Sequence, residues 1–169
     1  MNKEELKQVL EAHKKWLRDE EGGKRANLRG ADLRGAYLRG AYLIGADLRG
    51  AKIADEVLRH VFPILCPEAG SFIGWKKAGC RIVKLLVTED AKRSSAFSRK
   101  CRCSKASVLA IENYDGTAAE ETEIASSYDR SFIYRIGATV EVPDFCEDRK
   151  IECAPGIHFF ITRQEAVDY

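Results

Sequence analysis

The densest group of side chains that could do chemistry lies between residues 92 and 105. Two basic stretches frame a serine-rich segment, and the group comprises Lys92, Arg93, Ser94, Ser95, Ser98, Arg99, Lys100, Arg102 and Lys105. Guanidinium forks and hydroxyls bind phosphates and carboxylates, so this composition predicts an anion site. The residues that bind the anion would be Arg93, Ser94, Ser95, Lys100 and Arg102. The alternative is a solvated loop beside a basic strand edge, which guards against edge pairing.

A second candidate centres on Cys153 and His158, which are separated by a Pro-Gly turn. An imidazole near a thiol raises the thiolate fraction and can make the sulfur a nucleophile, so the pair could be catalytic. His158 is also flanked by Ile157 and Phe159, and that setting is typical of a hydrogen-bonded core histidine. The sequence assigns no Asn or Asp that would orient the imidazole.

Six cysteines stand at positions 66, 80, 101, 103, 146 and 153. Structural zinc sites use pairs with Cys-x-x-Cys-like spacing, and Cys101-x-Cys103 does not have it, so we expect no metal and no cofactor. Residues 1–10 are charged and lack the apolar stretch of a secretory signal. We therefore expect a cytoplasmic protein whose thiols are all reduced.

The composition excludes two broad classes. A net charge of +2 over 169 residues does not fit a nucleic-acid-binding polycation. The longest apolar runs, such as residues 82–87, are far too short to span a membrane. A hydrophobic content of 45% is enough for a real core.

Residues 26–55 repeat with a period of five: ANLRG, ADLRG, AYLRG, AYLIG, ADLRG, AKIAD. This period fits neither the 3.6 residues of a helical turn nor the two of a strand. It fits a chain that turns a corner every five residues, with Leu and Ala pointing inward. Tyr37, Tyr42 and Ile44 then point outward and form an apolar patch. This patch is a surface for intramolecular packing, or for a partner or a second copy of the chain.

This register resembles the pentapeptide-repeat family, whose members form right-handed quadrilateral β-solenoids. The resemblance implies about one and a half coils over residues 24–55. Some members imitate duplex DNA, a role that requires a long acidic rod. This repeat carries more basic than acidic residues: Arg29, Arg34, Arg39, Arg49 and Lys52 against Asp32, Asp47 and Asp55. The short basic repeat therefore argues against DNA mimicry.

The segments around the repeat complete a mainly β architecture. Apolar residues at helical spacing predict a helix over residues 3–20, with Asn2 as its N-cap and Glu5 completing a capping box. We expect residues 1–23 to cap the solenoid and residues 56–70 to close and link it. Residues 71–169 would form a small β-rich (α+β) domain. Its predicted strands cover residues 72–77, 81–87, 106–112, 132–136, 139–142 and 157–162. Residues 115–128 are predicted to be a mobile loop, and residues 163–169 a short helix after Thr162.

The C-terminal region also resembles a domain of phage and prophage proteins. The similar segments are KLLVTEDAKRSSA (84–96), KCRCSKASVLAI (100–111), VEVPDFCEDR (140–149) and ECAPGIHFFITRQEAVDY (152–169). In that family the domain follows a leading helix and a short pentapeptide array. The resemblance implies a viral or mobile-element origin and no particular activity. Lys150 departs from its pattern, and Cys80, Cys103 and Cys146 are not part of it.

Three functions follow as hypotheses. The first is a non-enzymatic binding protein of phage type that acts on a host component in the cytoplasm, with counter-defence as one such role. The second is a binder of a small anionic ligand, such as a nucleotide, through the C-terminal domain. The third is a cysteine-dependent enzyme that uses Cys153 and His158.

Overall fold

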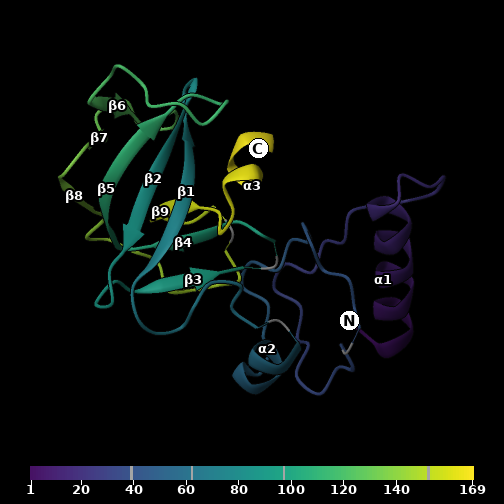
Figure 1. Cartoon of the computed structure of the whole chain (residues 1–169). Helices are drawn as coiled ribbons and strands as arrows, with labels where there is room; N and C mark the ends of the chain where they lie inside the picture. The colour runs from purple at the N-terminus through teal and green to yellow at the C-terminus, as the bar shows by residue number, and fades with distance from the viewer. Residues whose placement is uncertain (39, 62, 97, 152) are drawn as a thin grey trace. The chain divides into compact units, whose positions relative to one another are not determined.

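The computed structural model describes residues 1–169 except Arg39, Phe62, Phe97 and Glu152, and leaves out the side chains of Asp55, His60 and Val61. The chain is mainly β with few helices (Figure 1). It divides into two compact units. The first contains residues 1–64, 96–98 and 148–152, and the second contains residues 65–95, 99–147 and 153–169. Within the described residues, no helix is both long and apolar enough to cross a membrane.

The first unit begins with helix α1 (Lys3–Leu17), as the sequence predicts. The Asn2 side chain accepts the Glu5 N–H, and the Glu5 carboxylate accepts the Asn2 N–H, which completes the expected capping box. The helix ends at Leu17, before the predicted residue 20. The helix ends there because the N–H groups of Arg18 and Glu20 both donate to the carbonyl oxygen of Lys15.

The repeat turns once in every block of five residues. In each block the N–H of the following Ala bonds the Leu carbonyl three residues earlier, for example Ala31 to Leu28 at 3.1 Å. The Gly at the third position of each turn has a φ between 67° and 76°, which non-glycine side chains rarely adopt. Leu28, Leu33, Leu38, Leu43 and Leu48 are at most 1% exposed. The predicted inward direction of the leucines is thus confirmed.

Residues twenty positions apart lie side by side in the repeat. Parallel bridges join Asn27 to Asp47 and Asp32 to Lys52. The N–H of Leu28 donates to the Asp47 carbonyl at 2.8 Å. Four blocks of five residues therefore bring the chain back beside its starting point.

Two helices of the same unit pack against this leucine core. Leu6 of α1 and Leu58 of α2 (Asp55–Val61) are buried in one cluster with the repeat leucines. The ring of His13 is buried, and its Nε2 lies 3.1 Å from the Ile44 carbonyl. The Arg25 side chain donates to the Gly45 carbonyl. These contacts give hydrogen-bond partners to the carbonyls of Ile44 and Gly45 in the repeat.

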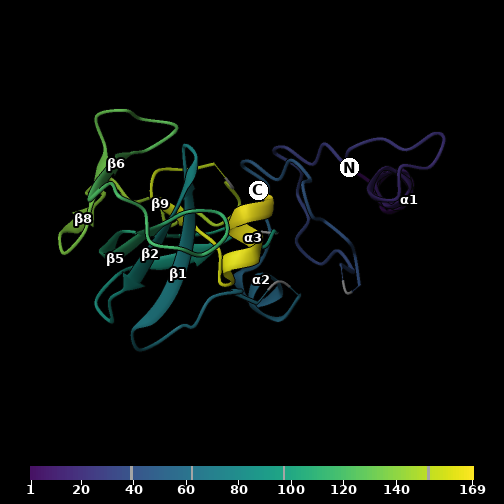
Figure 2. The same cartoon turned by 45° about the horizontal axis from the view of Figure 1, so that its top comes forward.

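The second unit contains an antiparallel sheet in the order β1-β2-β5-β8 (Figures 1 and 2). Its strands are β1 (Phe72–Ala78), β2 (Arg81–Val87), β5 (Lys105–Glu112) and β8 (Thr139–Glu141). Leu109 is a bulge, because Lys84 pairs with Ala110 while Leu85 pairs with Val108. The strand predictions for this sheet are confirmed, with ends that differ by at most one residue.

A second sheet has the order β3-β4-β9 and consists of β3 (Arg93–Ser95), β4 (Cys101–Cys103) and β9 (Ile157–Phe159). Ser104 alone separates β4 from β5. Beyond β9, Phe160 and Trp75 of β1 exchange backbone bonds of 2.8 and 2.7 Å. Backbone pairing therefore runs from β5 to β2, β1, β9 and β4 in turn. The contact between β1 and Phe160 joins the two sheets.

The sequence did not predict β3, β4 or β6 (Glu123–Ala125). Their sequences, RSS, CRC and EIA, lack the runs of Ile, Val, Phe and Tyr by which the other strands were predicted. The prediction of a mobile loop over residues 115–128 is wrong for β6, which pairs with β7 (Ile133–Arg135). The predicted closing helix is confirmed as α3 (Arg163–Asp168), with a capping box between Thr162 and Glu165.

Candidate functional site

Arg93, the central residue of the predicted anion site, holds backbone carbonyls. A guanidinium has five N–H donors. Those of Arg93 point at the carbonyls of Pro67, Gly70, Thr88, Glu89 and Ala91, at distances of 2.7–3.2 Å. The same group lies over the Phe72 ring, 5.3 Å from its centre. Arg93 thus ties loops of the second unit together and has its donors engaged before any ligand arrives.

Ser94 and Ser95 are buried in β3, at 4% and 0% exposure. The Ser95 hydroxyl accepts the Leu65 N–H at 2.9 Å. Ser95 therefore fixes the beginning of the second unit. Neither serine presents a hydroxyl on an open surface, as the anion-site prediction would require.

Lys100 and Arg102 lie beside the second predicted group. Lys100 Nζ is 3.2 Å from the Tyr169 hydroxyl and 3.7 Å from Cys153 Sγ. Arg102 is directly opposite His158 in the β4–β9 ladder, is 2% exposed, and donates from Nε to the Cys146 carbonyl. The structure thus brings the two sequence candidates side by side, with the lysine rather than the imidazole next to the Cys153 sulfur.

His158 has the surroundings of a structural histidine. Its Nε2 lies 3.0 Å from the Ala154 carbonyl. Burial, together with the charges of Lys100, Lys76 and Arg102, lowers the pKa of His158 to about 4. An imidazole with that pKa is a weak base at neutral pH, so the arrangement does not favour a cysteine–histidine nucleophile.

Lys76 lies beside Lys100 and His158, and no motif in the sequence pointed to it. Its Nζ donates to the His158 carbonyl at 3.3 Å and lies over the Tyr134 ring. Burial and the neighbouring Lys100 charge lower the pKa of Lys76 to about 8. The only signal in the sequence was a lysine pair at the end of an apolar strand, which is also typical of a solvated strand end.

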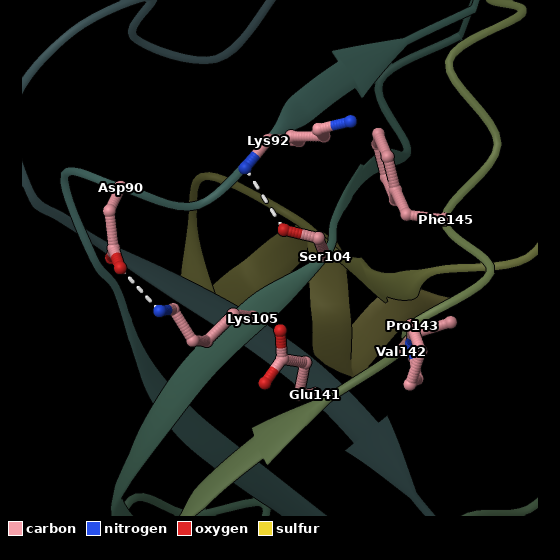
Figure 3. Close-up of a pocket in the computed structure, with 8 residues that line it drawn as sticks. All are labelled: Asp90, Lys92, Ser104, Lys105, Glu141, Val142, Pro143 and Phe145. Atoms are coloured by element: carbon pink, nitrogen blue, oxygen red, sulfur yellow. Dashed lines mark hydrogen bonds and ion pairs between the residues drawn. The ribbon is translucent and has the colours of Figure 1, made fainter.

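A shallow hollow of about 200 Å³ lies beside β8 in the second unit (Figure 3). It is lined by Asp90, Lys92, Ser104, Lys105, Glu141, Val142, Pro143 and Phe145. Lys105 pairs with Asp90, and Lys92 pairs with Glu147. Because both lysines are already engaged with carboxylates, the hollow offers no concentrated charge to a small ion.

All six cysteines are free thiols. Cys66, Cys101 and Cys103 are buried, whereas Cys80 and Cys153 are exposed. Among the described residues, no group of three or more His, Cys, Asp or Glu side chains could hold a metal ion.

The outward positions of the repeat carry aromatic side chains and paired charges. Tyr37 is 79% exposed, Tyr42 62% and Ile44 52%. Ion pairs join Arg34 to Asp32 and Arg49 to Asp47 within their own blocks. Trp16 of α1 is 41% exposed, and its ring would be 3.3 Å from a Cβ on Gly45, so it borders the Ile44 block. Tyr37 and Tyr42 belong to consecutive blocks, and we call the exposed surface that carries Trp16, Tyr37, Tyr42 and Ile44 the aromatic face.

Two family models match the sequence. Residues 62–166 match a model described as a family of unknown function, DUF5758, and residues 24–54 match the model of pentapeptide repeats in eight copies. The first match covers more than half of the chain. The second confirms the resemblance of the five-residue repeat. No curated protein and no solved structure matches the chain.

Proposed function

The chain belongs to the DUF5758 family of unknown function, and from this premise we propose that it is a non-enzymatic binding protein whose aromatic face docks on an acidic protein surface. The observation that carries the proposal is the contrast between neighbouring residues of the repeat. Leu38 is 1% exposed, whereas Tyr37 beside it is 79% exposed. Tyrosine and tryptophan are the side chains that most often dominate protein interfaces.

The charge of the repeat supports an acidic partner. Residues 24–55 carry seven Lys and Arg side chains against three Asp, a net charge of +4, while the whole chain carries +2. Complementary charge around an apolar centre accelerates association and selects the partner. Two copies of the same basic face would repel each other, which favours a different protein over a second copy.

The proposal includes the shape of the platform. Residues 24–55 would form a right-handed quadrilateral β-solenoid of about one and a half coils, capped by α1. The parallel bridges between residues twenty positions apart support that arrangement. A rigid platform holds the tyrosines in place before binding, so less conformational entropy is lost when the complex forms. The phage or prophage origin, the host protein as the partner and the cytoplasmic location belong to the same proposal.

Photo-crosslinking tests this proposal. The photoreactive residue p-benzoylphenylalanine replaces Tyr37 or Tyr42, with Arg29 as a matched exposed control position on the same repeat. Expression in the candidate host and irradiation should give one adduct from positions 37 and 42, and mass spectrometry identifies the attached protein. The purified partner is then titrated against wild type, Tyr37→Ala and Tyr42→Ala at low and high salt.

The expected result is an acidic partner whose affinity falls at least about tenfold in each tyrosine variant, as expected for a central aromatic contact. Its affinity should also weaken as the salt concentration rises. An adduct with a second copy of the chain would contradict the acidic partner and indicate self-association instead. Equal affinity of wild type and both variants for the identified partner would remove the aromatic face from the interface.

A further inference from the structure

Two buried thiols of the second unit lie together beside the point where the chain enters it. Cys66 is 3% exposed and Cys101 is 0% exposed. The Leu65 N–H donates to the Ser95 hydroxyl at 2.9 Å, and Ser95 is the direct partner of Cys101 in the β3–β4 ladder. This brings residue 66 close to Cys101 of β4.

The two sulfurs are chemically unequal. The hydrogen bond from Cys101 lowers the pKa of the Cys66 thiol and raises the pKa of the Cys101 thiol, and the Arg93 charge also lowers the pKa of Cys66. The Cys101 sulfur is also 3.7 Å from the Arg99 carbonyl. A thiol of lowered pKa beside a thiol of raised pKa favours oxidation to a disulfide, because the first sulfur attacks the oxidant more readily and the second resolves the product.

We propose that Cys66 and Cys101 form a reversible disulfide when the protein meets hydrogen peroxide. The Cys66 thiolate attacks one peroxide oxygen, the O–O bond breaks, and the hydroxide that leaves takes up a proton as water. The Cys66 sulfenic acid is then attacked by Cys101 sulfur, which forms the S–S bond and releases a second water with the Cys101 proton. The peroxide is reduced by two electrons and the two thiols are oxidised by two.

The bond would fasten the beginning of the second unit to β4. At present that segment is held to β3, the neighbour of β4, by the Leu65–Ser95 hydrogen bond and by the contacts of Arg93 with Pro67 and Gly70. A covalent link adds to these contacts and restricts the unfolded chain. The exposed thiols of Cys80 and Cys153 give a matched comparison, since they meet the oxidant first.

Peptide mapping tests the proposal on the full-length protein. Reduced protein is treated with hydrogen peroxide, unfolded in denaturant with an alkylating agent, digested and analysed by mass spectrometry. The expected product is a linked pair of peptides containing Cys66 and Cys101, which dithiothreitol separates. Oxidised wild type should also melt at a higher temperature than reduced wild type. Cys80→Ser and Cys153→Ser should keep the linked pair, and Cys66→Ser should lose it.

Two results would overturn the proposal. One is full alkylation of Cys66 and Cys101 at peroxide doses well above the dose that oxidises Cys80 and Cys153 completely. The other is a linkage from Cys66 to Cys103, the third buried thiol, in place of Cys101. Because the linked pair is sought in wild type, the outcome does not depend on whether a cysteine variant folds.

Discussion

The buried ring of His13 bridges helix α1 to the carbonyl of Ile44, thirty-one residues away in the repeat, with Nε2 3.1 Å from that oxygen. The Ala26 N–H donates to Nδ1 at 3.2 Å, so Nδ1 is the acceptor and Nε2 carries the proton. The neutral imidazole is thus the form that fits between both backbone groups. Protonation would place an N–H of the ring against the Ala26 N–H.

The first prediction is a loss of stability of the first unit in mild acid. Burial is the main cause that lowers the pKa of His13 from 6.5, and the Arg25 charge adds to it. Below pH 6.5 the unfolded chain therefore binds more protons than the folded chain, and the free energy of unfolding falls as the pH drops through the folded pKa. Denaturant titrations at pH 7.5 and pH 5.5, followed by Trp16 fluorescence in a Trp75→Phe background, measure this.

His13→Gln is the control for that experiment. A glutamine amide can accept from one backbone group and donate to the other without titrating. The variant should lose less stability than wild type between the two pH values, while His158 titrates equally in both. The same pH dependence in wild type and variant would contradict the role of His13.

The repeat and the first helix could be predicted from sequence because their signals are local. Each of the first five blocks contains its own turn glycine and its own buried leucine, so the register of Leu38 needs no distant information. The capping box of Asn2 and Glu5 is likewise complete within four residues. Such elements depend on short-range physics that recurs in every occurrence.

The candidate site could not be predicted because its partners are distant in sequence and belong to the backbone. A basic, serine-rich segment looks the same whether its arginine faces a phosphate or five carbonyls. The partners of Arg93 at Pro67 and Gly70 come from a loop more than twenty residues earlier. Likewise, the short strands β3 and β4 are defined by their pairing and carry no periodic pattern of their own.

Arg93→Ala should destabilise the second unit. The change removes charge-assisted bonds to five carbonyls, and because part of the site is open to water we expect a loss of about 2 to 4 kcal/mol. Arg93→Lys should recover little, since an ammonium cannot reproduce the planar fork. Lys92→Ala, which removes an exposed ion pair with Glu147, should cost under about 1 kcal/mol. Chemical denaturation of the three variants measures this, and equal losses for Arg93→Ala and Lys92→Ala would contradict the structural role.

Gly74→Ala should strain the contact between β1 and β9. A Cβ on residue 74 would lie 2.7 Å from Cδ2 and 3.1 Å from Cγ of the fully buried Phe159 ring. Overpacking of this kind costs about 1 to 3 kcal/mol. In a Phe159→Leu background the cost of the added methyl group should be smaller, and a double-mutant cycle measures the difference. Additive losses would mean that the methyl group meets something other than the ring.

The last prediction compares two adjacent residues of the repeat. Leu38 is 1% exposed among the stacked leucines, so Leu38→Ala removes buried methyl groups, leaves a cavity and should cost about 2 to 4 kcal/mol. Tyr37 is 79% exposed, so Tyr37→Ala should cost under about 0.5 kcal/mol. Arg39, which follows Leu38 in the sequence, lies outside the described residues, and Tyr37 is therefore the control. Urea titrations monitored by Trp16 fluorescence give both values. If the two variants lost the same stability, the inward direction of the leucines would not be what holds the repeat together. The stability of Tyr37→Ala must also equal that of wild type before its effect on partner binding can be assigned to the interface.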